Sequence, residues 1–409
     1  MRACDVVIVG GGIAGGALAT ALADDGRDVV VLEATTKYED RVRGESMLPW
    51  GVKEARDLGV EQTLLDAGAH IAPTWVHYDC GVPQQISEAN PIPAAMMVPE
   101  VPGSLNLRHP EACNALNAAA QSAGAEVHRG VTDVTITAGA APKVRAQGAD
   151  GTTLDIAARL IVGADGRNST VRRQAEITLH RKPETNMITG LLLEGLDDIP
   201  DHYDFLASEG DLFMASFHQG NGQLRVYLCP PVEQRHRFSG KGGLETFLGS
   251  AAFSCLPFGD RLARATPAGP LATYPGDDSW VDEPFAEGVV LVGDAAGFNN
   301  PIIGQGLSIS MRDVRTVRDI VRADLELDAF AAYASERVER MRRLREAARL
   351  MAATFSDECD NRDARRAKFF ELQQSEPLML GLLIATFGGP EVGPEEAFDG
   401  RLVAEVQAA

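Results

Sequence analysis

The chain has 409 residues, 45% of them hydrophobic and 23% charged, which is ordinary for a globular protein of two to three domains. Its formal net charge of −20 excludes nucleic acid and anionic membrane surfaces as partners, because both would repel it. No stretch reaches the ~18 apolar residues of a membrane span and no secretory signal is recognisable, so we expect a cytoplasmic protein without membrane contact. The six cysteines and eight histidines show no metal-ligand spacing, so we expect reduced thiols and no metal site.

The N-terminus has the pattern of a strand, a glycine-rich turn, a helix and a second strand. Residues 5–9 are apolar and β-branched, as in a strand that is covered on both faces. The turn over residues 10–15 reads Gly-Gly-Gly-Ile-Ala-Gly, and the small residues 17–23 favour a helix. Residues 29–32 form the next apolar run, which ends on Glu33. The pattern is that of one βαβ unit of about thirty residues.

The spacing of Gly10, Gly12 and Gly15 is typical of a dinucleotide-binding turn. The first glycine permits the tight turn, the second lets the backbone approach a pyrophosphate, and the third lets helix and strand pack closely. The N-terminus of the helix offers free N–H groups to the phosphates. Glu33 ends the second strand, where its carboxylate can accept hydrogen bonds from an adenosine ribose. We therefore predict a Rossmann-type nucleotide site.

Loops, helices and short strands follow in chain order. Residues 35–46 are polar and predict a loop, residues 48–67 show helical patterns, and His109-Pro110-Glu111 begins another helix. Gly148-Ala-Asp-Gly151 predicts a hairpin turn. Residues 160–164 then form a buried strand.

The middle of the chain, about 180–280, changes character. Apolar residues alternate over 212–217 and 224–228, and Gly220-Asn-Gly222 joins these two runs. We expect a separate antiparallel sheet domain, after which the chain returns to the nucleotide domain at residues 288–292.

Beyond residue 302 the pattern is mainly helical. Residues 329–355 predict a long, arginine-rich amphipathic helix whose charges form a solvated face. The Gly/Pro-rich piece 388–394 predicts a loosely packed tail. The C-terminal helices either bury a homodimer interface or pack on the core, and the sequence leaves both open.

A second motif occupies residues 288–306. A buried strand ends in Gly293-Asp294, and Pro301-x-x-Gly304-x-Gly306 begins a helix. Asp294 can accept a hydrogen bond from a polyol hydroxyl, and the backbone N–H groups of Gly306 and Leu307 can face negative charge that develops on a reduced ring. A whole domain separates this motif from the first. We therefore favour the interpretation that the two motifs bind one ligand over the interpretation that the second is only a strand–turn–helix corner.

A third motif, Asp165-Gly166-Arg-Asn-Ser169-Thr-Val-Arg172, directly follows the strand 160–164. Asp165 and Ser169 can organise a turn and cap the next helix, which is a structural role. For Ser169 and Arg172, the structural and the ligand-binding interpretation both stay open.

These three motifs, in this order, resemble the GxGxxG, DG and GD signatures of FAD-dependent monooxygenases of the para-hydroxybenzoate hydroxylase fold, the class A flavoprotein monooxygenases. That superfamily also includes flavin-dependent halogenases and geranylgeranyl-type reductases. The resemblance covers roughly residues 1–345 and implies an α/β fold: a Rossmann-type FAD-binding domain, an inserted antiparallel-sheet substrate domain and C-terminal helices. The expected segments are 1–175 and 281–345 for FAD binding, 176–280 for substrate binding and 346–409 for a C-terminal helical extension.

The resemblance also implies which residues bind FAD non-covalently. Glu33 would hold the adenosine ribose, Arg43 would lie on the loop beside the flavin, and Arg108 would reach the phosphate and ribityl region. Asp294 would bind the ribityl chain, and Asp165 belongs to a motif associated with both FAD and NAD(P)H. The full set implied is Gly10, Gly12, Ile13, Ala14, Gly15, Glu33, Ala34, Arg43, Arg108, Val131, Asp165, Asp294, Pro301, Gly304, Gly306 and Leu307.

As to the reaction, the resemblance implies a monooxygenase with NAD(P)H as co-substrate. A flavin C4a-hydroperoxide, formed from molecular oxygen, would transfer one oxygen atom to a small aromatic or otherwise electron-rich substrate in a hydroxylation. Gly297 stands where many aromatic hydroxylases of this fold have a histidine, and that variant is shared with halogenases and reductases. A flavin-dependent reductase or dehydrogenase and a halogenase therefore stay open as alternatives, although residues 54–142 lack the lysine that a halogenase would place there.

The sequence names no catalytic base. The antiparallel sheet is expected to line the substrate pocket, but half of each strand points away from it. The candidate lining residues are Phe205, Phe213, Phe217, His218 and Tyr227.

Overall fold

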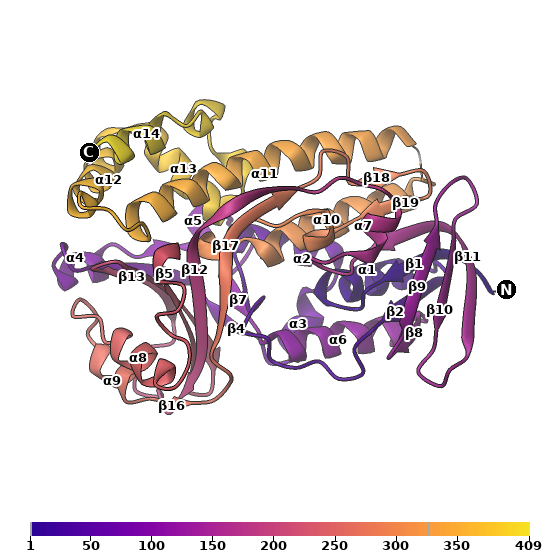
Figure 1. Ribbon diagram of the computed structural model, residues 1–409, viewed down its shortest axis with the longest axis horizontal. Helices are drawn as coiled ribbons and strands as arrows, with labels where there is room; N and C mark the ends of the chain where they lie inside the picture. The colour runs from indigo at the N-terminus through magenta and orange to yellow at the C-terminus, as the bar shows by residue number, and fades with distance from the viewer. Residues whose placement is uncertain (1, 326) are drawn as a thin grey trace.

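The structure is a computed structural model in which residues 2–325 and 327–409 are described. Two large sheets lie side by side, and helices cover them (Figure 1). The strands of the first sheet are β1 (Arg2–Val9), β2 (Val29–Glu33), β8 (Glu126–Arg129), β9 (Thr132–Thr137), β10 (Lys143–Gln147), β11 (Thr153–Gly163), β18 (Phe285–Ala286) and β19 (Val289–Leu291). Their order is β18-β19-β11-β1-β2-β8, with β10 paired to β11 and β9 paired to β10.

The centre of the first sheet is parallel, from β19 through β11, β1 and β2 to β8. β1 is buried on both faces, as its β-branched run predicts. Val6 and Ile8 pack with α1 (Ile13–Asp24) and α10 (Gly306–Arg322), whereas Val7 and Val9 pack against the residues of β9 and β10. The predicted βαβ unit and the β10–β11 hairpin are both confirmed.

The second sheet is mainly antiparallel, and α8 (Gly243–Ser250) and α9 (Gly259–Ala263) cover one of its faces. Its strands are β5 (Thr74–Asp79), β6 (Ile92–Pro93), β12 (His180–Glu194), β13 (Tyr203–Glu209), β14 (Leu212–Gly220), β15 (Gln223–Cys229), β16 (Thr266–Pro267) and β17 (Ala272–Trp280). β14 and β15 form the hairpin that Gly220-Asn-Gly222 predicts. The sheet extends beyond the expected segment 176–280, because β5 pairs in parallel with β13.

Helices fill the space beside and between the sheets. A small third sheet consists of β3 (Ser46–Met47), β4 (His70–Ala72) and β7 (Ser104–Asn106). The remaining helices are α2 (Pro49–Leu58), α3 (Glu61–Asp66), α4 (Gln84–Ala89), α5 (Ala94–Met97), α6 (His109–Ser122), α7 (Thr170–Gln174), α11 (Leu327–Phe355), α12 (Arg362–Ser375), α13 (Pro377–Gly388) and α14 (Arg401–Ala408). Short 3-10 helices are η1 (Val232–Gln234), η2 (Gly293–Ala296), η3 (Pro301–Ile303), η4 (Pro390–Val392) and η5 (Glu395–Phe398).

The C-terminal helices pack on the rest of the chain. In Figure 1 the yellow helices α12, α13 and α14 lie beside one end of α11 and over the end of the second sheet that carries β5 and β13. Met379, Leu382 and Leu402 are buried in the same core as the first sheet. The C-terminal helices therefore pack on the core, as in one of the two arrangements that the sequence left open.

Two predictions about the C-terminal part are wrong. The arginines of α11 do not simply form a solvated face, because Arg337 and Arg340 are buried and both contact the buried carboxylate of Asp313. The piece 388–394 is not a loose tail. Pro390 is buried, and the Arg343 guanidinium donates to the carbonyl oxygens of Pro390 and Gly393.

Candidate active site

A cavity of about 1470 Å³ runs from the glycine-rich turn after β1 to the second sheet and the C-terminal helices. It opens at the carboxyl ends of parallel strands, where α/β sheets bind their ligands. Its volume exceeds the ~300–1,000 Å³ of a site for a single small ligand. The cavity therefore has room for a nucleotide cofactor and a second molecule.

The three motif glycines differ in what surrounds them. Gly10 has a φ of +103°, and a Cβ there would lie 2.4 Å from the carbonyl oxygen of Ala164. A Cβ on Gly15 would lie 1.8 Å from the Gly10 oxygen, so this glycine allows α1 to pack on β1. A Cβ on Gly12 would meet no protein atom within 4 Å, and Gly12 lines the cavity. The open side of the turn is thus where a phosphate can approach the backbone.

The N-terminus of α1 and Glu33 lie at the same end of the cavity. Gly12 precedes α1 and gives the helix no side-chain cap, so the positive end of the helix is left for an anion. The Glu33 carboxylate accepts hydrogen bonds of 2.6 Å from the backbone N–H groups of Gly11 and Thr35. These bonds fix its orientation, and its remaining lone pairs can accept ribose hydroxyls.

Asp165 has one satisfied and one unsatisfied oxygen. Its Oδ2 accepts from the backbone N–H groups of Thr170 and Val171 at the start of α7. Its Oδ1 is buried and has no partner among the described residues, although Asp165 lines the cavity. Buried acceptors are usually paired, so this oxygen fits a ligand hydroxyl or water.

Ser169 and Arg172 have structural roles. The Ser169 hydroxyl accepts from the Arg172 backbone N–H and caps α7. The buried Arg172 guanidinium donates to the carbonyl oxygens of Ala295 and Arg167. The structural interpretation of both residues is confirmed.

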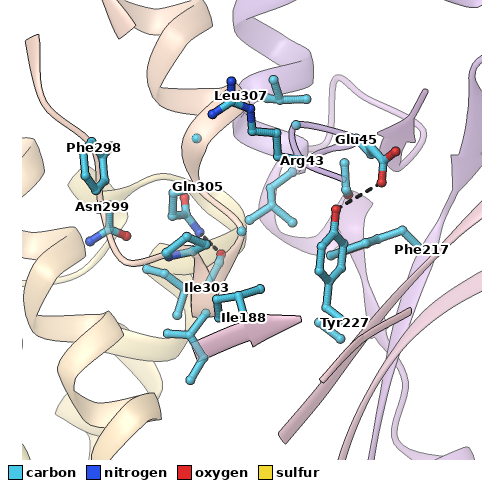
Figure 2. Close-up of a pocket in the computed structure, with 18 of the residues that line it drawn as sticks. Arg43, Glu45, Ile188, Phe217, Tyr227, Phe298, Asn299, Ile303, Gln305 and Leu307 are labelled. Atoms are coloured by element: carbon cyan, nitrogen blue, oxygen red, sulfur yellow. Dashed lines mark hydrogen bonds between the residues drawn. The ribbon is translucent and has the colours of Figure 1, made fainter. Parts of the chain in front are cut away.

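Asp294 lies on η2, directly after β19, and its carboxylate lines the cavity 3.4 Å from the Arg167 guanidinium. The turn is held from behind, since the Gly293 N–H donates to Asp313 over 2.9 Å. η3 follows, and Figure 2 shows Leu307 at the start of α10 near Arg43, with Gln305 and Ile303 on the preceding turn. The GD motif and the loop after β2 thus face the same space.

All predicted cofactor contacts except Gly15 and Arg108 line the cavity. Gly15 lies behind the turn, where it serves the packing of α1. Arg108 precedes α6, and its half-exposed guanidinium pairs with Glu111. The geometry gives Arg108 no contact with the cavity, because its side chain turns to its own helix.

The far part of the cavity is a mostly apolar chamber between the second sheet and the C-terminal helices. Of the predicted lining residues, Phe213, Phe217 and Tyr227 line it. Phe205 and His218 do not, since they contact each other on the other face of the sheet, with ring centroids 6.2 Å apart. The alternation of strand residues decides which of them reach the chamber.

Several chamber residues were missed from the sequence. Trp75 and His77 come from β5, Phe369 and Phe370 from α12, and Phe387 from α13. The alternation of residues 74–79 and the unbroken apolar run of α13 were signals for buried elements, but neither says which cavity they line.

The mouth of this chamber is apolar. Ile86, Met96, Leu380 and Val392 all line the cavity and are 51% to 79% exposed. They belong to α4, α5, α13 and η4; α13 contacts both α5 and η4, and α4 packs on β5. An apolar molecule can therefore contact apolar side chains from the surface inward.

Comparison with known proteins agrees with this geometry. The FAD binding domain family, as a sequence profile, matches residues 3–238. The chain belongs to this family. Its fold is shared with FAD-dependent monooxygenases of known structure, and its nucleotide cofactor is FAD.

Similar proteins include enzymes named for different substrates. Squalene monooxygenase SE1 of Panax ginseng is 26% identical over 324 residues, which is 78% of this chain and 58% of that protein. The chain thus spans little more than half the length of this relative. The structure of p-nitrophenol 4-monooxygenase PnpA from Pseudomonas putida DLL-E4 is 17% identical with a TM-score of 0.75, covering 97% of this chain and 100% of that chain. PqsL from Pseudomonas aeruginosa is 21% identical with a TM-score of 0.73, covering 87% of this chain and 97% of that chain.

Across residues 2–325 and 327–409, His, Cys, Asp and Glu side chains form no group of three or more that could hold a metal ion. Among the helices that the structure describes, none combines the length and apolar character that a membrane crossing requires.

Proposed function

We propose that this protein is an FAD-dependent monooxygenase that transfers one oxygen atom to an electron-rich, largely apolar substrate, with NAD(P)H as reductant. The observation that carries the proposal is the continuity of the cavity from the FAD-binding turns to the aromatic chamber. When bound, FAD supplies the redox chemistry that activates molecular oxygen. The chain itself binds and orients the two molecules and excludes water between them.

The residues divide that work. The backbone of residues 10–14 and the N-terminus of α1 hold the pyrophosphate, Glu33 the ribose, and Asp165 and Asp294 the polyol hydroxyls. Leu307 and Arg43 lie where the flavin ring would meet the chamber (Figure 2). Beyond them, Phe217 and Tyr227 present an apolar wall with ring centroids 5.8 Å apart. Such a wall keeps water away from the reacting atoms and so suppresses side reactions with water.

Two kinds of substrate fit this chamber. Hydroxylation of an aromatic ring is supported by the aromatic lining and by the likeness to p-nitrophenol 4-monooxygenase. Epoxidation of an alkene is the second candidate, and it is favoured by the apolar mouth formed by Ile86, Met96, Leu380 and Val392. No lysine lines the described cavity, which disfavours halogenation.

The test is oxidation of NADH or NADPH by the purified yellow protein under air, with oxygen consumption and product mass followed. Candidate substrates are simple phenols, polycyclic aromatics and isoprenoid alkenes. Substrate-stimulated oxidation that yields a product heavier by one oxygen atom supports the proposal. Turnover only with halide and a partner reductase would show a halogenase, and oxygen-independent reduction of the substrate would show a reductase. Either result would overturn the proposal.

A further inference from the structure

A hydrogen-bonded group of polar side chains lies within the mostly apolar chamber. His77 and Asp79 lie two residues apart on β5, so both project from the sheet face that lines the cavity. β13 runs parallel to β5, with Ser208 opposite Asp79. The Ser208 hydroxyl lies 3.4 Å from His77 Nε2 and also contacts the Asp79 carboxylate. Residues distant in sequence thus form one hydrogen-bonded row.

This row lies farther from the FAD side of the cavity than the wall formed by Phe217 and Tyr227. Trp75, on the same face of β5, contacts Phe217 with ring centroids 5.6 Å apart, and Phe217 in turn contacts Tyr227. Asp79 comes four residues after Trp75, which is about 13 Å along a strand. The His77 ring contacts Phe213, Phe355 and Phe370, with centroids 6.4, 5.5 and 6.2 Å away. The polar row is therefore at the aromatic end of the chamber.

The hydrogen bonds of the row have a defined direction. The Asp79 carboxylate accepts from the Gly81 N–H over 2.8 Å and from the Ser208 hydroxyl. A hydroxyl has one hydrogen, so Ser208 accepts when it contacts His77. His77 Nε2 must then carry the proton, and Nδ1 keeps a free lone pair. Nδ1 makes no hydrogen bond to any described residue, and the half-buried His77 faces the cavity it lines.

The charge state of the imidazole agrees with this assignment. Burial lowers the pKa of His77 to about 4, with Asp79 acting in the opposite direction and Arg366 in the same direction as burial. The ring is therefore neutral near neutral pH, with one donor nitrogen and one acceptor nitrogen.

We propose that His77 Nδ1 accepts a hydrogen bond from a hydroxyl group of an otherwise apolar substrate, and so fixes the end of the substrate that is remote from the flavin. This specificity rests on the proposed function, since it describes the same chamber. The substrate class is a neutral apolar alcohol or phenol. A carboxylate, an ether or a ketone offers no hydrogen for Nδ1. Ser208 and Asp79 are positioning residues, because they hold the imidazole in the accepting tautomer.

The experiment uses 2-naphthol and 2-methoxynaphthalene, which share one ring system and differ in a hydrogen-bond donor. Their binding to the oxidised, FAD-containing protein is titrated through the change in the flavin absorption spectrum. For the unmodified protein we expect about fivefold tighter binding of the naphthol, the size of one ordinary hydrogen bond. In His77→Phe this ratio should fall to about one, and in His77→Gln, whose amide oxygen accepts, it should be partly retained.

Ser208→Ala tests the tautomer of His77, because a purely structural role of Ser208 would leave the ratio of the two probe affinities unchanged. Without its serine partner, the imidazole can place its proton on Nδ1, so the methyl ether should bind more tightly and the ratio should shrink. Gln373→Leu changes another polar residue of the chamber and is the matched control, for which the ratio should stay unchanged. FAD content and the thermal midpoint of each variant report whether it is folded.

An equal affinity of the unmodified protein for both probes would overturn the inference. The inference would also be overturned if folded His77→Phe kept the affinity ratio of the two probes, or if that ratio changed in Gln373→Leu instead. If His77→Phe does not fold, His77→Gln and Ser208→Ala still decide the matter. Because binding is measured without turnover, loss of the naphthol preference in a protein that forms oxygenated product refutes only this inference. A retained preference without any oxygenated product refutes only the proposed function.

Discussion

Tyr227 donates a hydrogen bond of 3.1 Å to Glu45, and this bond ties the second sheet to the loop beside the FAD site (Figure 2). Arg225, two residues earlier on β15, contacts the same carboxylate and lies 2.6 Å from Asp40. The side chains of Arg225 and Glu45 are both 0% exposed. Burial raises the pKa of Tyr227 well above its usual value, so the phenol keeps its proton and remains the donor.

Arg225→Met should be strongly destabilising. It leaves the buried Glu45 carboxylate without its cation, which costs about 3–5 kcal/mol. The double variant Arg225→Met/Glu45→Gln should recover much of that loss, because both buried charges are then removed. Urea unfolding of the three proteins measures this. A loss below about 1 kcal/mol in the single variant would contradict the importance of the pair.

Substitutions of Gly12 and Gly15 should have different effects: one should weaken FAD binding and the other should lower the stability of the fold. Gly15→Ala forces a Cβ against the Gly10 carbonyl and should lower the free energy of unfolding by about 1–3 kcal/mol or more. Gly12→Ala meets no protein atom and has a φ of −66°, so the stability of the FAD-free chain should change by no more than about 0.5 kcal/mol.

The same Gly12→Ala variant should bind FAD at least about tenfold more weakly, a loss of ~1.4 kcal/mol, because its methyl group occupies the approach of the pyrophosphate. Fluorescence titration of the FAD-free variants gives the affinities, and thermal or urea unfolding gives the stabilities. Equal FAD affinity of Gly12→Ala and the unmodified chain would place the phosphate elsewhere.

Asp313→Asn should destabilise the protein by about 3–5 kcal/mol, because it leaves two buried guanidinium groups without their carboxylate. Since the Gly293 N–H also donates to Asp313, the variant should lose FAD more readily. The matched control is Glu339→Gln on the exposed side of α11, the helix that carries the two buried arginines.

Glu339 pairs with Arg342 and Arg343 at the surface, and these guanidinium groups lower its pKa to about 2. Exposed pairs contribute little, so the control should change stability by less than about 1 kcal/mol. If Asp313→Asn and Glu339→Gln lose comparable stability, the buried arginines of α11 contribute no more to the stability of the protein than the exposed pairs.

His77 should make the stability depend on pH in the acid range. In the unfolded chain a histidine binds a proton near pH 6.5, whereas the folded protein resists protonation of His77 until about pH 4. Between these values the unfolded state binds more protons, so stability falls as the pH is lowered. By pH 4.5 the loss from this residue is about 2–3 kcal/mol. Between pH 7 and 4.5 the free energy of unfolding of His77→Gln should therefore fall by about that much less than that of the unmodified protein. If the two proteins lose stability equally over this range, the prediction is wrong.

The FAD half of the site was predictable because its residues are neighbours along the chain. Gly10, Gly12 and Gly15 fix a turn whose geometry depends on local backbone freedom, and Glu33 follows at the end of the next strand. The same is true of Asp294 and the turn up to Leu307. Short-range sterics determine the strand, the turn and the helix, so the spacing of the motif residues alone indicated a nucleotide-binding turn.

The substrate half was decided by tertiary structure. Asp79 and Ser208 meet although they are 129 residues apart, because β5 leaves the FAD-binding segment to pair with β13. No local pattern specifies a parallel pairing over such a distance. Likewise, Arg337 reads in the sequence as one charge on an amphipathic helix, and only the packing of α11 against α10 brings it to Asp313. The sequence by itself thus determined the turns and strand ends at the nucleotide end of the cavity, whereas long-range packing determined which side chains line the chamber, since burial and pairing between distant segments depend on the whole fold.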